Sequence, residues 1–105
     1  MLTEYYCYCD KDTAFALQKL GYYSYIFYDD GMPAIHLWHA QKWLREEKDV
    51  LIIVCSYTYS VVDKIHTWTC EIWFGDNLEY EIHDFKSYEE ALSEGIKEAV
   101  KILKE

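Results

Sequence analysis

The chain has 105 residues and a mass of 12.6 kDa, enough for one domain built around one hydrophobic core. Apolar residues make up 51% of it, and 19 acidic against 10 basic residues give a net charge of −9. This composition excludes a disordered chain and argues against direct binding to nucleic acid or to an anionic membrane surface. We therefore expect a single domain over residues 1–105.

The N-terminus, MLTEYYCYCD, has neither a positively charged start nor a continuous apolar run. It does not match a secretory signal peptide, so we expect no export by that route. The four cysteines, Cys7, Cys9, Cys55 and Cys70, are irregularly spaced. We expect free thiols rather than a disulfide framework, with Cys55 and Cys70 in the core.

A short helix is predicted over residues 12–20, because Asp12 or Thr13 can cap its start and Gly21 can end it. The aromatic and β-branched run over residues 22–28 is followed by an Asp-Asp-Gly turn sequence. This run is typical of a strand, and we expect it to be the first strand of the sheet.

Pro33 suits the first turn of a second helix, which we expect to reach Lys48. Its buried side is predicted at Leu37, Ala40, Gln41 and Leu44, in an apolar stripe wide enough to include Ile35, Trp38 and Lys42. The branched apolar run over residues 50–54 predicts a buried strand.

A turn is expected near residues 56–60, followed by a strand over residues 61–74. Alternation predicts that this strand faces the core with His66, Trp68, Cys70 and Ile72. The Gly-Asp-Asn sequence then predicts a hairpin to residues 78–82.

A final helix begins at Ser87, which can form a capping box with Glu90 and is followed by a buried stripe at Tyr88, Leu92, Ile96, Ala99 and Leu103. Gly95 in this helix indicates a close approach to the sheet. The predicted fold class is α+β, with a small antiparallel sheet of about four strands and two or three helices packed on one face.

Four features of the chain occur together: Pro33, the Trp-Leu-Arg-Glu sequence at 43–46, Trp68, and the helix from Ser87 with Gly95-Ile96 and Ala99. In this combination the chain resembles a group of small proteins encoded by phages and prophages of gut Bacteroidales. The resemblance covers most of the chain and implies a setting, the cytoplasm of an infected or lysogenic bacterium. It implies no activity and no site residues.

Some residues of the chain are of types that bind metals or act in catalysis. Cys7, Cys9, His36 and His39 are zinc-compatible in type, but one residue between the cysteines is fewer than structural zinc sites use. No nucleophile motif and no glycine-rich phosphate loop is present, and His66 and Cys70 are about 13 Å apart on a strand. We expect no metal, no cofactor and no catalytic activity.

Eight acidic residues lie between Glu71 and Glu94, against the single basic residue Lys86. A basic protein partner is one interpretation of this local charge, and a solvated surface is the other. The residues expected to bind the partner are Glu71, Glu79, Tyr80, Glu81 and Asp84.

The chain also has eleven tyrosines, four tryptophans and four phenylalanines, which is more than one small core can bury. Our first hypothesis is a non-catalytic accessory protein of phage or mobile-element origin. It would bind a host protein through an acidic, tyrosine-rich surface, with inhibition of a defence or nucleic-acid-processing system as the outcome. The alternative is a protein that sequesters a nucleotide-like ligand in an aromatic pocket, at the interface of a homodimer. The ligand-binding residues would then be Tyr25, His39, Lys42, Trp43 and Arg45.

Overall fold

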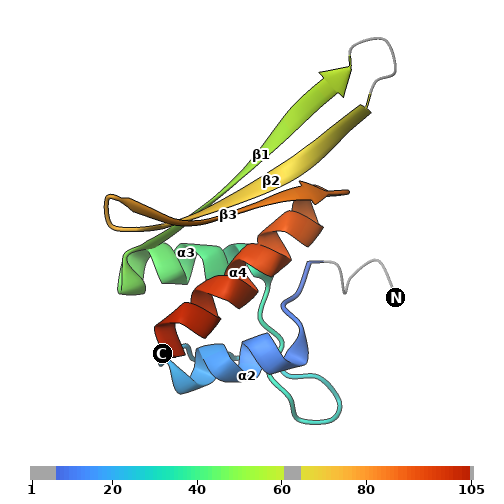
Figure 1. The fold of residues 1–105 in the computed structure, drawn as a ribbon. Helices are drawn as coiled ribbons and strands as arrows, with labels where there is room; N and C mark the ends of the chain where they lie inside the picture. The colour runs from blue at the N-terminus through green and yellow to red at the C-terminus, as the bar shows by residue number, and fades with distance from the viewer. Residues whose placement is uncertain (1–6, 61–64, 105) are drawn as a thin grey trace.

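A computed structural model describes residues 7–60 and 65–104. Its elements are α2 (Lys11–Lys19), α3 (Leu37–Lys48), β1 (Val50–Ser60), β2 (Ile65–Phe74), β3 (Asn77–Phe85) and α4 (Tyr88–Lys104). The strands form an antiparallel sheet in the order β1-β2-β3. Helices α3 and α4 cover one face of the sheet, and α2 packs on α4 away from it (Figure 1). The α+β class is confirmed, with three strands in the described part of the chain rather than about four.

The strand expected over residues 22–28 is absent, because this segment lies in a loop between α2 and α3. A single bridge joins Phe27 to Pro33, and the Ser24 hydroxyl donates to the carbonyl oxygens of Ile26 and Ala34. Within the loop, the Tyr28 N–H also donates to the Met32 carbonyl and the Ala34 N–H to the Ile26 carbonyl. Aromatic and β-branched residues favour a strand only where a neighbouring strand supplies partners.

Both N-terminal helices begin at residues other than those expected. Helix α2 is capped by Asp10, whose carboxylate accepts from the Thr13 N–H at 2.8 Å. Helix α3 begins at Leu37, because Pro33 is held in the bridge and His36 acts as the cap. Its buried side is Leu37, Ala40 and Leu44 as predicted, but the stripe is narrower, since Trp38 is 61% exposed and Lys42 is also exposed.

Strand β1 is twice as long as the buried run that predicted it. Its pairing with β2 continues from Val50 opposite Phe74 to Thr58 opposite His66, so the turn expected at residues 56–60 is wrong. Aromatic and β-branched residues after Ser56 favour this continuation. Residues 61–64, expected to begin the next strand, and the expected inward side chain of His66 lie outside what the structure describes.

One part of the core lies between the sheet and α4, and the rest lies among the three helices. Ile52, Cys70 and Ile72 face Leu92 and Ile96, and all five side chains are at most 2% exposed. The expected start of α4 is confirmed, because the Ser87 hydroxyl accepts from the Glu90 N–H at 3.1 Å.

The close approach predicted at Gly95 is also confirmed. A Cβ at this position would overlap Cys70 Sγ and lie 2.9 Å from Ile52 Cγ2. Only a glycine lets α4 lie this close to β1 and β2.

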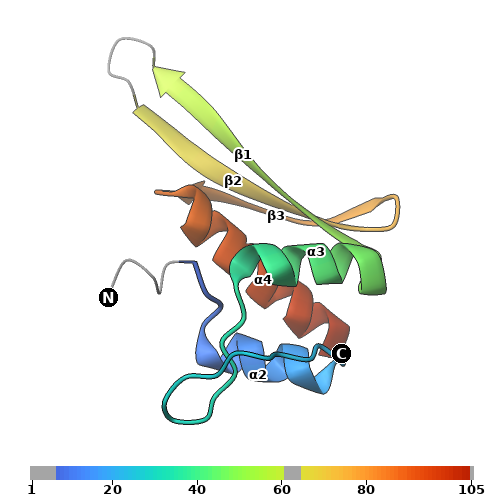
Figure 2. The same ribbon diagram turned by 180° about the vertical axis from the view of Figure 1, so that it is seen from behind.

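Beyond the body of the domain, β1 and β2 continue as a two-stranded arm that β3 does not follow (Figures 1 and 2). The last β3 residue paired with β2 is Phe85, opposite Trp68. No helix in residues 7–60 or 65–104 is long and apolar enough to cross a membrane.

Candidate functional site

The face of the sheet turned away from α3 and α4 is not covered by any described helix, and we call it the open face (Figure 1). Side chains alternate along a strand, so the neighbours of the buried Ile52 and Ile72 point to this face. The strand registers place the following residues on it: Leu51, Ile53, Cys55, Thr69, Glu71, Trp73, Leu78, Glu81 and His83.

Two carboxylates occupy the centre of the open face. Glu71 on β2 lies directly opposite Glu81 on β3 in the strand register. Side chains opposite each other in an antiparallel pair have Cβ atoms about 5 Å apart, and like charges in such a pair are destabilising. We therefore expect the two negative charges to oppose each other in the free protein.

The surrounding polar groups fix both carboxylates in place. The Trp73 Nε1–H donates to Glu71 Oε1 at 3.1 Å. On the other strand, His83 Nε2 lies 3.1 Å from Glu81 Oε1, and His83 Nδ1 lies 3.1 Å from the Thr69 hydroxyl. Glu81 keeps 38% of its side-chain area exposed, so the pair is both ordered and accessible.

The other three residues expected to bind a partner do not lie where strict alternation along β3 would place them. The register shifts between Tyr80 opposite Ile72 and Leu78 opposite Trp73, which leaves Glu79 as an extra residue in a bulge. Tyr80, opposite the buried Ile72, belongs to the helix-covered side of the edge strand and is 45% exposed. Asp84 lies at the second irregularity of β3 with a φ of 72°. Of the five expected partner-binding residues, the register thus pairs only Glu71 and Glu81.

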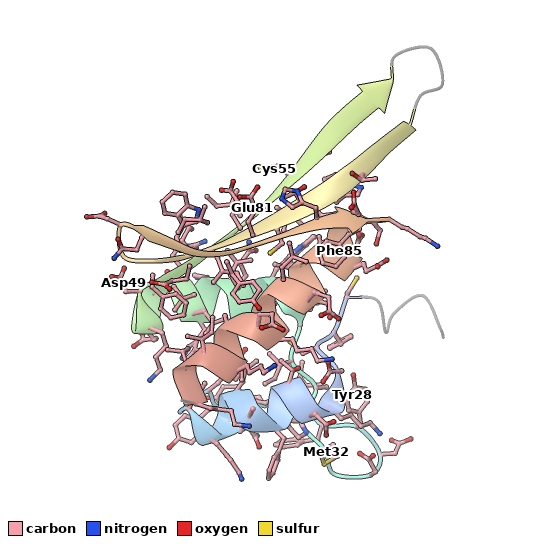
Figure 3. The ribbon with its side chains drawn as sticks, viewed as in Figure 1. Tyr28, Met32, Asp49, Cys55, Glu81 and Phe85 are labelled. Atoms are coloured by element: carbon pink, nitrogen blue, oxygen red, sulfur yellow. The ribbon has the colours of Figure 1, made fainter. Side chains whose placement is uncertain are left out.

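The acidic and tyrosine-rich surfaces are not one surface. Tyr23 and Tyr25, at 84% and 93% exposure, belong to the loop before α3, at the opposite side of the molecule from the open face. Figure 3 shows this separation, with Glu81 on the sheet and Tyr28 in the loop beside α2. The tyrosines of this loop therefore lie apart from Glu71 and Glu81, because the loop does not join the sheet.

A small cavity lies under the tyrosines. It has a volume of about 210 Å³ and is lined by Tyr8, Tyr22, Tyr23, Ser24, Tyr25, Ile26, Ala34, His36 and His39. His36 Nδ1 accepts from the Trp38 N–H at 3.2 Å, and burial together with the nearby His39 lowers the pKa of His36. The cavity brings together two of the five residues expected to bind a ligand, Tyr25 and His39.

The other three expected ligand-binding residues lie outside this cavity. Trp43 packs edge-on against Tyr22 at 5.5 Å between ring centroids, and the Lys48 ammonium lies over the Trp43 ring. Lys42 and Arg45 are exposed along α3. No lysine or arginine lines the cavity, so nothing among its described residues neutralises a phosphate.

The backbone of Cys7–Cys9 lies beside that of residues 35–37, where the Cys9 N–H donates to the Ile35 carbonyl and the Leu37 N–H donates to the Cys7 carbonyl. Cys9 is 3% exposed in the core, where burial and the neighbouring Asp10 raise the pKa of its thiol to about 12. Burial raises the pKa of Cys70 to about 12 as well. In the part of the chain that the structure describes, no three His, Cys, Asp or Glu side chains gather as a metal site would require.

Comparisons with protein-family models, with curated proteins and with solved structures find no match to this chain. Function is therefore inferred from the geometry of the chain itself. Sequence reasoning found Glu71 and Glu81 but missed Thr69, Trp73 and His83 as their neighbours. Alternation already placed Trp73 on the outer side of its strand, whereas the position of His83 depends on the bulge at Glu79, which no local pattern predicts.

Proposed function

We propose that this protein is a non-catalytic binding protein whose open face docks onto a basic surface of a partner protein. The observation that carries the proposal is the Glu71–Glu81 pair, held side by side on a face that no described helix covers. A lysine or arginine from a partner, placed between the two carboxylates, removes their mutual repulsion and forms charge-assisted hydrogen bonds. The two charges are therefore expected to be more stable in a complex than in the free protein.

Apolar side chains beside the carboxylates supply the rest of an interface. Leu51 and Leu78 are 39% and 43% exposed, and the half-buried Trp73 lies between β1 and β3 on the same face. Interfaces combine such aromatic and aliphatic contacts at the centre with polar groups around them. The open face has both kinds of group within three adjacent strands.

The resemblance to phage and prophage proteins suggests the kind of partner. A host protein with a basic groove, such as a nucleic-acid-processing or defence protein, presents positive charge that complements the negative charge of the open face. Occupying that groove would inhibit the host protein without any catalysis. Under this proposal the protein acts in the cytoplasm of a bacterial host.

The test is a charge reversal at the paired positions. Glu71→Lys combined with Glu81→Lys changes the net charge from −9 to −5 and leaves two like charges opposite each other, so the fold faces the same local repulsion. The control, Glu46→Lys with Glu47→Lys on α3, makes the same change of net charge away from the sheet. Affinity capture from bacterial lysate with the three proteins should retain a basic partner on the wild type and the control only. Equal capture by all three proteins would exclude the proposal.

A second candidate function is favoured by the cavity that joins Tyr25 and His39. An aromatic wall stacks on a planar ring, and the ligand would be a neutral nucleobase-like group because no lysine or arginine lines the cavity. Native mass spectrometry of protein purified without added nucleotide tests this candidate. An adduct of a few hundred daltons that Tyr25→Ala removes and Arg45→Ala retains would support it, and an unmodified chain mass would count against it.

A further inference from the structure

Strand β1 is an outer strand of the sheet, and its free side can be assigned from the hairpin geometry. The β2–β3 turn has two residues, Gly75 and Asp76, with Phe74 opposite Asn77 and a Gly75 φ of 60°. In such a hairpin the closing pair exchanges backbone hydrogen bonds, so Phe74 directs its N–H and C=O toward β3. Alternation then directs the backbone groups of Trp73 toward β1.

The same alternation fixes the direction of the backbone groups in β1. Leu51 lies opposite Trp73, and the register stays regular up to Thr58. Leu51, Ile53 and Cys55 therefore bond to β2, and the residues between them direct their N–H and C=O outward. A side-chain contact agrees with this assignment, because Gln41 Nε2 donates to the Ile52 carbonyl at 2.9 Å.

Beyond Ile52, the described residues provide no such cover. Val54, Ser56 and Thr58 point their backbone groups outward along a part of β1 that continues into the arm (Figures 1 and 2). The whole of β1, Val50–Ser60, contains no charged residue and no proline, in a chain that is 28% charged. An uncharged outer strand of this length pairs with further strands unless something blocks it.

The other outer strand of the same sheet is protected in the ways that natural sheets use. Strand β3 carries Glu79, Glu81 and Asp84 and has two register irregularities. Charges and bulges prevent pairing of sheet edges. The contrast between the two outer strands indicates that β1 is left open for a partner strand.

We propose that the free side of β1 pairs with β1 of a second copy of this chain, antiparallel about a twofold axis near Ser56. Antiparallel pairing of a strand with its own copy is self-complementary, as a twofold dimer requires. The absence of charge in β1 lets two chains of net charge −9 approach there without like charges meeting across the ladder. The result is one continuous sheet of six strands.

The shape of the arm allows this dimer. Because the arm projects past β3 and α4, overlapping two arms in opposite directions places the helices of the two copies at opposite ends of the joined strands (Figure 1). The outward positions Val54, Ser56 and Thr58 then pair with one another around the axis. The open faces of both copies become continuous, with one Glu71–Glu81 pair on each side.

The experiment is sedimentation velocity combined with native mass spectrometry on the wild type, Ser56→Lys and Gln18→Lys. Ser56 is exposed, and a lysine there places two like charges opposite each other at the axis. Gln18→Lys adds the same charge on α2, away from the sheet. We expect twice the chain mass of 12.6 kDa for the wild type and for Gln18→Lys, and the single chain mass for Ser56→Lys with an unchanged circular dichroism spectrum.

Hydrogen exchange of the wild type locates the contact independently of any variant. The amides of Val54 and Ser56 should exchange slowly at concentrations where the dimer forms and faster on dilution. A wild type that stays at the single chain mass at every concentration overturns the proposal. So does a dimer that Ser56→Lys leaves intact, or one in which these two amides exchange as fast as in the monomer.

Discussion

On its helix-covered face the sheet presents Ile52 and Ile72 to α4, and their side chains are 2% and 0% exposed. On its open face, the neighbouring residues of the same strands include Glu71 and Leu51, which is 39% exposed. Two faces made by alternate residues of one strand thus have opposite effects on stability. The covered face supplies apolar burial, which stabilises the fold. The open face keeps a like-charge pair that opposes stability, which is the pattern expected where a surface is selected for binding.

Truncation of adjacent β1 residues should show the largest difference between the faces. Ile52→Ala removes a fully buried side chain and should lower the free energy of unfolding by about 3 kcal/mol. Leu51→Ala, one residue away on the open face, should lower it by less than about 1 kcal/mol. Urea denaturation of both variants measures the difference, and equal losses would mean that the open face is part of the core.

A methyl group added at Gly95 tests the close packing of the covered face. Gly95→Ala should destabilise the protein by about 2 kcal/mol, because overlap with Cys70 Sγ and Ile52 outweighs the better helix propensity of alanine. Combining it with Cys70→Ala removes one of the two overlapping groups. Thermal denaturation should therefore show a double variant more stable than the sum of the single changes predicts.

The two cysteines near the middle of the sheet should differ in reactivity. Burial raises the pKa of Cys70 on the covered face to about 12, so iodoacetamide at pH 8 should modify it more than about tenfold more slowly than Cys55 on the open face. Peptide mass spectrometry after timed labelling measures both rates, with labelling in denaturant as the control.

The raised pKa values of Cys9 and Cys70 also predict how stability depends on pH. In the unfolded chain these thiols ionise near their ordinary pKa of 9.0, whereas in the folded protein they ionise near 12. Their contribution to the free energy of unfolding is therefore complete below pH 9.0 and is lost as the pH rises toward 12. Replacing both thiols with alanine should flatten the fall in stability between pH 9 and pH 11 in urea denaturation.

The smallest expected effect is a gain in stability on the open face. Glu71→Gln removes one of the two opposed charges and should raise the free energy of unfolding by about 0.5 kcal/mol at low ionic strength. The gain should shrink in concentrated salt, which screens exposed charges. Glu46→Gln on α3, which removes the same charge away from the sheet, is the control.

Much of the fold follows from local patterns. Ser87 marks the start of α4, and the alternation around Cys70 and Ile72 predicts both the strand and its buried side. The prediction of a strand at residues 22–28 fails because propensity does not specify a partner strand. The prediction of a turn at residues 56–60 fails for a related reason, since pairing with β2 overrides a turn-like composition.

The site is less accessible to sequence reasoning than the fold. The acidic character of the residues from Glu71 to Asp84 is evident in the sequence, but their arrangement depends on the bulge at Glu79. That bulge returns Glu81 to the position opposite Glu71 and turns His83 toward Thr69. Register irregularities depend on packing between strands, so no pattern within one strand reveals them.

The measurement that tests the account most directly combines stability and binding in one variant, Glu71→Gln with Glu81→Gln. Its midpoint of thermal denaturation and its affinity for the partner captured by the wild type are measured together. We expect a higher midpoint than the wild type and an affinity at least about tenfold lower, because the repulsion and the contacts to the partner are lost together. A variant that gains stability and keeps its full affinity would contradict the assignment of the open face as the binding surface.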